Sequence, residues 1–227
     1  MLLGFGAAVA GEIPASERKS GYQFMSRDTK ALQDDELTGP AALWLLDGEA
    51  LWTRLGCASC HANMKGVAAR YPAVVDGKLV NLEQQVRHKA PALAYESREL
   101  LALTAFVARQ SKGMAIEVKA VEPYLDRGRA FFQRRQGQLD LACTQCHDDN
   151  WGKKLAGSTI PQAHPTGYPI YRLEWQTMGS LARRFRNCLT GMRAELYPPG
   201  APELVELELY LMWRARGMSL DAPGVRP

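Results

Sequence analysis

The feature that most constrains this chain is a CxxCH motif that occurs twice, at residues 57–61 and 143–147. Two thiols at this spacing can reach both vinyl groups of one porphyrin, and the adjacent histidine can then bind the iron. A zinc site would need further ligands at matching spacing, which the sequence does not supply. We therefore expect two covalently bound haem c groups, attached through Cys57, Cys60, Cys143 and Cys146, with His61 and His147 as iron ligands.

Composition excludes several other classes. The 227 residues are 46% apolar, enough for a packed core, and the 28 basic residues are interspersed with 24 acidic ones. Such mixing argues against nucleic-acid binding, which favours long basic runs. Residues 1–10 are apolar and end in Ala8-Val9-Ala10, the small-x-small form of a signal-peptidase site. No segment reaches membrane-spanning length. We expect a signal peptide over 1–10 and a periplasmic protein with no membrane span.

The chain contains an internal duplication. Gly48 and Gly128 begin similar stretches before the two motifs, and each is surrounded by apolar residues near helical spacing. These apolar residues are Leu43, Leu46, Ala50 and Leu51 in the first half, and Val121, Leu125 and Phe132 in the second. The pattern predicts a helix before each CxxCH.

A second repeated stretch follows each motif. Residues 99–114 align without a gap onto 203–218, and both end in Gly-Met. Leu100, Leu103 and Val107 share one helical face, as do Leu204, Leu207 and Leu211. Gly113 and Gly217 are typical helix stops. Each half is thus expected to close with an amphipathic helix.

Helix, CxxCH, irregular loop and closing helix is the order of a small cytochrome c domain. We predict a mainly α protein with two cytochrome c-like domains in tandem and long irregular loops around each haem. The expected boundaries are 11–114, a linker at 115–123, and 124–227 for the domain with the active haem. The alternative is one helical domain with two metal motifs, which the ungapped repeat disfavours.

The duplication also suggests the sixth iron ligands. Residues 81–88 align with 180–187, and the next residue in the second half is the fifth cysteine, Cys188. Neighbouring Arg184 and Arg186 favour its thiolate, a good ligand for haem iron. His88 lies at nearly the same position in the first half, with Met64 as its competitor. His164 could hydrogen-bond a haem propionate or pack within its loop.

Several long strings of this sequence resemble SoxA, the larger cytochrome subunit of the SoxAX complex of bacterial sulfur oxidation. They are residues 20–26, 33–35, the string HPTGYPIYR at 164–172, RRFRNC at 183–188 and the final 225–227. The resemblance covers almost the whole chain after the expected signal peptide.

The resemblance implies an enzyme, an L-cysteine S-thiosulfotransferase that joins thiosulfate to a cysteine of the SoxY carrier protein. Two electrons pass through haem to the SoxX cytochrome, the heterodimer partner. It also implies that the second haem is the active one, that Cys188 carries a persulfide, and that Arg184 binds substrate. Helical spacing instead pairs positions 183 and 186, so Arg186 is kept as a second donor or a propionate partner.

One departure from the family concerns the first haem. Two-haem relatives commonly place a cysteine ligand where this chain has Lys89, with His88 beside it. The sequence thus predicts two histidine ligands for the first haem, unlike theirs. Two rival functions stay open at this stage: a passive two-haem electron carrier, and a thiosulfate dehydrogenase that forms tetrathionate.

Overall fold

The structure is a computed structural model that describes residues 13–227, so the expected signal peptide at 1–10 lies outside the described residues. Its α-helices are α1 (Arg27–Asp34), α2 (Ala42–Arg54), α3 (Leu82–Lys89), α4 (Arg98–Arg109), α5 (Tyr124–Gln133), α6 (Cys143–His147), α7 (Leu181–Gly191) and α8 (Pro202–Arg214). Short 3-10 helices are η1 (Ala15–Glu17), η2 (Gly21–Phe24), η3 (Cys57–Ser59) and η4 (Ala68–Arg70). The prediction of a mainly α protein is confirmed.

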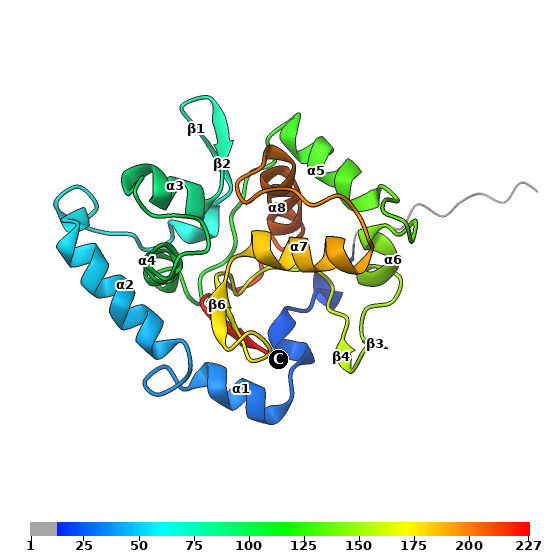
Figure 1. Cartoon of the computed structure of the whole chain (residues 1–227), viewed down its shortest axis with the longest axis horizontal. Helices are drawn as coiled ribbons and strands as arrows, with labels where there is room; N and C mark the ends of the chain where they lie inside the picture. Colours follow the sequence, from blue (N-terminus) through cyan, green and yellow to red (C-terminus); the bar gives the residue numbers. More distant parts are fainter. Residues whose placement is uncertain (1–12) are drawn as a thin grey trace, which may run out of the picture.

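Two helix pairs form the frame. Helix α2 packs on α4 on one side of the molecule, and α5 packs on α8 on the other (Figure 1). A glycine stands at each crossing: a Cβ at Gly48 would overlap the carbonyl of Ala102, and one at Gly128 would overlap the carbonyl of Glu206. The duplicated glycines therefore mark the points where two backbones touch.

The first helix of each pair forms where the sequence predicts it, but α2 buries a different face. Leu43 and Leu46 are 66% and 60% exposed, whereas Trp44, Gly48 and Leu51 are buried. The buried set recurs at i, i+4 and i+7, which is one face of a helix. Apolar residues occur on both faces of α2, so periodicity alone could not select the packed one.

The closing helices agree with the prediction in detail. In α4 the side chains of Leu100, Leu103 and Val107 are buried, and the three equivalent leucines of α8 are buried as well. Both Gly113 and Gly217 have φ +80°, in the left-handed region where glycine is favoured. The repeat thus extends from the sequence to the backbone conformation.

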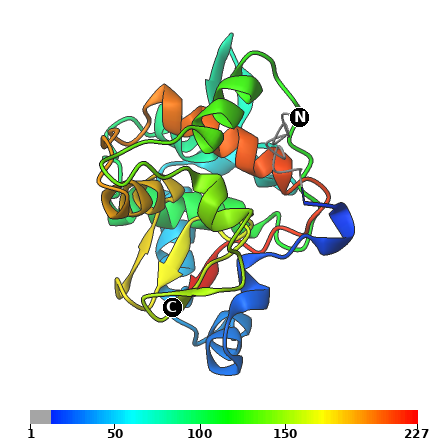
Figure 2. The ribbon, with the colours of Figure 1, turned by 90° about the vertical axis from the view of Figure 1, so that its right-hand side faces the viewer.

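A small sheet near the C-terminus packs against η2 and α1. Strand β5 (Ile170–Arg172) is central, with β6 (Thr177–Gly179) antiparallel to it and β7 (Gly224–Arg226) parallel, so that Ile170 is opposite both Gly179 and Gly224. Figure 2 shows the N-terminal segment alongside β7. Gln33 accepts hydrogen bonds from the Val225 amide and the Arg226 guanidinium. Residues 13–35 therefore pack against the second half, although they precede the first motif.

Two antiparallel hairpins complete the structure: β1 (Ala73–Val75) with β2 (Lys78–Val80), and β3 (Lys154–Leu155) with β4 (Ser158–Thr159). Two apolar clusters lie inside, one around α2 and α4, the other around α5, α7 and α8. Neither cluster is made from one half of the chain alone. Met178 of β6 packs in the cluster around α2 and α4, and Ile116 and Val118 pack in the cluster around α5, α7 and α8. The segment expected as a linker, 115–123, therefore contributes buried side chains.

Candidate functional site

A cavity of about 550 Å³ opens beside the second CxxCH. Cys143 and His147 of α6 line it on one side, and Arg184 and Cys188 of α7 line it on another. Residues 157–172, which run through β4 to the end of β5, supply much of the remaining wall, together with η2 from the N-terminal segment. Its volume falls within the range of small-molecule and cofactor sites.

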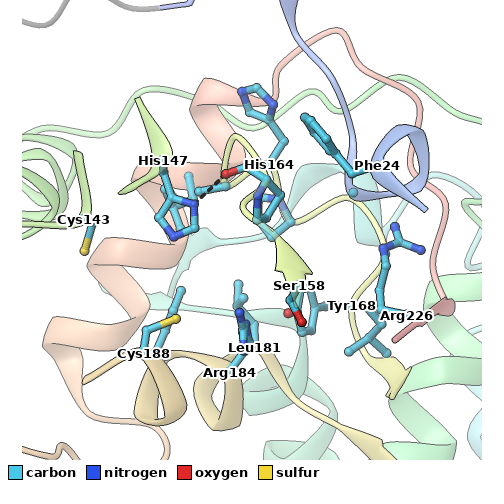
Figure 3. Close-up of a pocket in the computed structure, with 18 of the residues that line it drawn as sticks. Phe24, Cys143, His147, Ser158, His164, Tyr168, Leu181, Arg184, Cys188 and Arg226 are labelled. Carbon is cyan, nitrogen blue, oxygen red and sulfur yellow. Dashed lines mark hydrogen bonds between the residues drawn. The ribbon is translucent and has the colours of Figure 1, made fainter. Parts of the chain in front are cut away.

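Helix α7 places Cys188 opposite His147. Ser180 caps the helix by accepting a hydrogen bond from the Arg183 amide, which fixes where its turns begin. Leu181, Phe185 and Leu189 lie on the same face of α7 as Arg184 and Cys188, and all five residues line the cavity. Figure 3 shows Cys188 and Arg184 rising from α7 toward the side from which His147 points.

The imidazole of His147 is held in one tautomer. Its Nδ1 lies 2.7 Å from the carbonyl of Pro161, which can only accept, so Nδ1 donates and Nε2 keeps its lone pair. Burial raises the pKa of the Cys188 thiol, but the interaction with His147 and the charges of Arg184 and Arg172 outweigh it and lower the pKa. The Cys188 sulfur therefore has thiolate character and lies next to the His147 imidazole.

The two cysteines of this motif are half-buried. Burial raises the pKa of Cys143 to about 12, and that of Cys146 is raised for the same reason. A charged thiolate is disfavoured at these positions, whereas a thioether carries no charge. Their setting suits covalent attachment to a haem better than ligation of a metal ion.

The three arginines of α7 point in different directions. Arg184 lines the cavity; burial lowers its pKa, but the nearby Cys188 sulfur outweighs this and raises it. Arg183 stacks 4.3 Å from the ring centroid of Trp175. Arg186 donates to the carbonyl of Tyr197 at 3.1 Å and is not among the residues that line the cavity. The geometry therefore favours Arg184 as the substrate contact over Arg186.

His164 lines the same cavity. Its Nδ1 lies 2.9 Å from the carbonyl of Lys19, and burial lowers its pKa to about 4, so the ring is neutral near pH 7. Because Nδ1 donates, Nε2 is an acceptor. A neutral His164 cannot donate to an ionised propionate from Nε2, and packing within its loop is the better of the two expectations.

The first CxxCH has a different setting. Cys57 is half-buried in η3, Cys60 is exposed, and His61 lies 6.3 Å from the ring of Trp52, measured between centroids. None of these residues lines the cavity described above. The motif therefore lies at the surface, at the end of α2.

Helix α3 is the counterpart of α7 in the first half. Asn81 caps α3 as Ser180 caps α7, each accepting from the amide three residues later. Lys89 lies eight residues after Asn81, and Cys188 lies eight residues after Ser180. Lys89 is therefore the counterpart of Cys188, and His88, one residue earlier, lies about 100° away around the helix. Both His88 and Lys89 are exposed, and Met64 is half-buried. Ligation by His88 stays a prediction.

Sequence reasoning missed part of the cavity wall. Phe24 of η2, Thr166, Tyr168, Arg172 of β5 and Arg226 of β7 all line it. Two of the strings that carry the family resemblance, 164–172 and 20–26, contain the first four of these residues. The strings that carry the family resemblance were therefore the signal that could have revealed them.

The residues beside α6 fit a covalently held haem. They combine two attachment cysteines, an imidazole lone pair, an opposing sulfur and a cavity between them. Throughout residues 13–227, no group of three or more His, Cys, Asp or Glu side chains is close enough to hold a metal ion directly. All five cysteines are free of disulfides. In the same range, no helix is long and apolar enough to cross a membrane.

Comparison with known proteins identifies the relatives of this chain. Residues 47–116 match the family model described as "SoxA/TsdA, cytochrome c domain", whose name implies covalently bound haem c. A SoxA subunit of L-cysteine S-thiosulfotransferase from Pseudaminobacter salicylatoxidans is 31% identical over 94% of this chain and 82% of its own length. The subunit of the same name from Rhodovulum sulfidophilum is 32% identical over 92% and 80%.

A solved structure agrees with the sequence relatives. The crystal structure of SoxXA from P. pantotrophus contains a chain that superposes with a TM-score of 0.88 at 30% identity, covering 92% of this chain and 87% of the other. The resemblance found in the sequence is therefore confirmed: this chain belongs to the SoxA family.

Proposed function

We propose that this protein is the SoxA subunit of an L-cysteine S-thiosulfotransferase, with the reaction centre in the cavity between α6 and α7. The name and identity of its relatives support the enzyme class. The single observation that carries the site is Cys188, which lies opposite the His147 lone pair in a cavity that also contains Arg184. A passive electron carrier has no use for a cysteine among arginines.

The reaction joins the terminal sulfur of thiosulfate to the thiol sulfur of a carrier cysteine. One sulfur–sulfur bond forms, the thiol loses one proton, and two electrons are released. Cys143, Cys146 and His147 would hold a haem, which would supply an electron acceptor beside the reacting sulfurs; a SoxX-type partner cytochrome would be the final acceptor. Arg184 binds the dianion through charge-assisted hydrogen bonds and orients its terminal sulfur toward Cys188.

The proposal includes finer points. The chain holds two haems in two cytochrome c-like domains, Cys188 carries a persulfide, and the protein works in the periplasm on a SoxY-type carrier. The matching helix pairs with Gly48 and Gly128 support the two domains. The burial of Cys143 supports attachment in the second half.

Product analysis tests the function. The purified complex of this chain with its SoxX-type partner is incubated with thiosulfate and an oxidised cytochrome c, with and without a SoxY-type carrier. We expect a thiosulfate adduct on the carrier cysteine by mass spectrometry, and no adduct on a carrier whose cysteine is replaced by serine. Tetrathionate without carrier would instead identify a thiosulfate dehydrogenase, and no product would identify an electron carrier.

A further inference from the structure

The loop that ends in β5 leaves three buried side-chain atoms without hydrogen-bond partners among the described residues. They are His164 Nε2, Thr166 Oγ1 and Arg172 Nε, and all three residues line the cavity. Buried polar atoms in native proteins are nearly always paired. A ligand in the cavity is therefore expected to complete part of this set.

The chemistry of the three atoms separates them. His164 donates from Nδ1 to Lys19, so its free Nε2 is an acceptor and repels an anion. The Thr166 hydroxyl can donate or accept. Arg172 Nε–H is a donor on a fixed positive charge, so it is the group among these three that is suited to an anion.

The surroundings of Arg172 leave its charge only partly neutralised. The residue is 8% exposed, and its Nη2 lies 3.2 Å from the Glu174 carboxylate, which is itself 47% exposed. Burial and the nearby Arg184 lower the pKa of Arg172. Two guanidinium groups thus lie near one another and near Cys188, and one of them has a single, solvent-screened carboxylate partner.

We propose that Arg172 is a second substrate-binding residue, which together with Arg184 binds the sulfonate oxygens of the dianion; this inference rests on the proposed function. Two guanidinium groups match the two negative charges of thiosulfate. They come from separate elements, β5 and α7, so they can contact different oxygens of one tetrahedral group and fix its orientation.

Binding of thiosulfate to the oxidised holo-complex, measured by calorimetry without carrier protein, tests this role. We expect Arg172→Gln to weaken binding about 10- to 100-fold, the cost of losing hydrogen bonds to a charged group. Arg172→Lys should restore part of the lost thiosulfate affinity. Sulfate, an unreactive tetrahedral dianion, should compete with thiosulfate in the wild type and lose affinity in parallel in the variant.

Glu174→Gln is the matched control, because it removes the carboxylate partner of Arg172 and leaves the arginine in place. An anion-binding Arg172 predicts tighter binding in this variant, by up to about fivefold. A merely structural Arg172 predicts unchanged or weaker binding with a lower melting temperature. This variant keeps the inference testable even where Arg172→Gln fails to fold.

The outcomes separate the two proposals. If the wild type forms the carrier adduct while a folded Arg172→Gln binds thiosulfate normally, the role of Arg172 is wrong and the proposed function stands. A changed haem spectrum with unchanged thiosulfate affinity would instead assign Arg172 to the haem. If no carrier adduct forms in any variant, the proposed function itself fails.

Discussion

The two halves of this protein share a frame but differ in what surrounds the CxxCH motif. Both have a helix pair in contact at a glycine, and both have a capped helix between the motif and the closing helix. The second motif lies beside a cavity of about 550 Å³, whereas the first lies at the surface with Cys60 exposed. Duplication therefore preserved the CxxCH motif and its helix pair, but not the cavity beside it.

The difference arises between the motif and the capped helix. In the second half this connection, residues 148–180, is longer than residues 62–81 in the first, and it includes β3, β4, β5 and β6. Helix α7 also continues past Cys188, whereas α3 ends at Lys89. The longer connection supplies cavity-lining residues, and Cys188 places a sulfur beside them at the position that Lys89 occupies in the first half.

The largest predicted effect comes from removing the Cys188 sulfur, which the first half lacks. Cys188→Ala should lower thiosulfate-dependent activity by on the order of 1,000-fold, as expected when a group at the reaction centre is lost. Both haems should stay attached, because the substitution leaves all four motif cysteines intact. Carrier adduct formation and the electron paramagnetic resonance spectrum of the second haem are the measurements.

The matched control is Asn187→Ala, which alters an exposed neighbour on the same helix. It should leave activity and spectrum unchanged. Full activity in Cys188→Ala would show that the cavity sulfur has no part in the reaction.

The shared frame makes its own prediction about stability. Gly48→Ala and Gly128→Ala each force a Cβ into a backbone carbonyl, and each should lower the free energy of unfolding by about 1–3 kcal/mol. Gly191→Ala is the control, since a Cβ there meets no atom within 4 Å and φ is not positive. Urea titration checks all three, and a large effect in only one half would argue against equivalent helix pairs.

The contact between α3 of the first half and α8 of the second should make the stability of the protein depend on pH. Burial, with Glu96 and Glu208 nearby, raises the pKa of Glu83 to about 8, and burial raises that of Glu208 to about 7. The Asn81 amide donates to Glu208 at 2.8 Å, which joins α3 to α8. Between pH 4.5 and about 8 the folded protein binds more protons than the unfolded chain, so stability falls as pH rises.

The expected loss from pH 5 to pH 8 is about 2–4 kcal/mol for each carboxyl, measured as a falling urea midpoint. Glu208→Gln and Glu83→Gln should each flatten the profile. A profile that keeps its slope in both variants would assign the pH response to other groups.

The smallest expected effect concerns the first haem. His88→Ala should change the electron paramagnetic resonance signal of that haem only, and leave activity within about twofold, as for other surface substitutions. Lys89→Ala, its exposed neighbour, is the control and should change neither. An unaltered signal in His88→Ala would remove this histidine as a ligand.

Local features of the sequence determined much of this protein. The spacing of CxxCH, the leucines of α4 and α8, the stops at Gly113 and Gly217, and the caps at Asn81 and Ser180 depend on residues close together in the chain. Such contacts leave periodic or motif-like signatures, so the helix before each CxxCH and the two closing helices could be predicted from the sequence.

Only the tertiary structure decided which helix faces are buried and which residues line the cavity. It placed Trp44 rather than Leu43 in the core, and it turned Arg184 into the cavity but Arg186 toward Tyr197. It also brought Phe24, Arg172 and Arg226 to one wall from distant parts of the chain. These contacts depend on how long loops close, and loop closure leaves no periodic signature in the sequence.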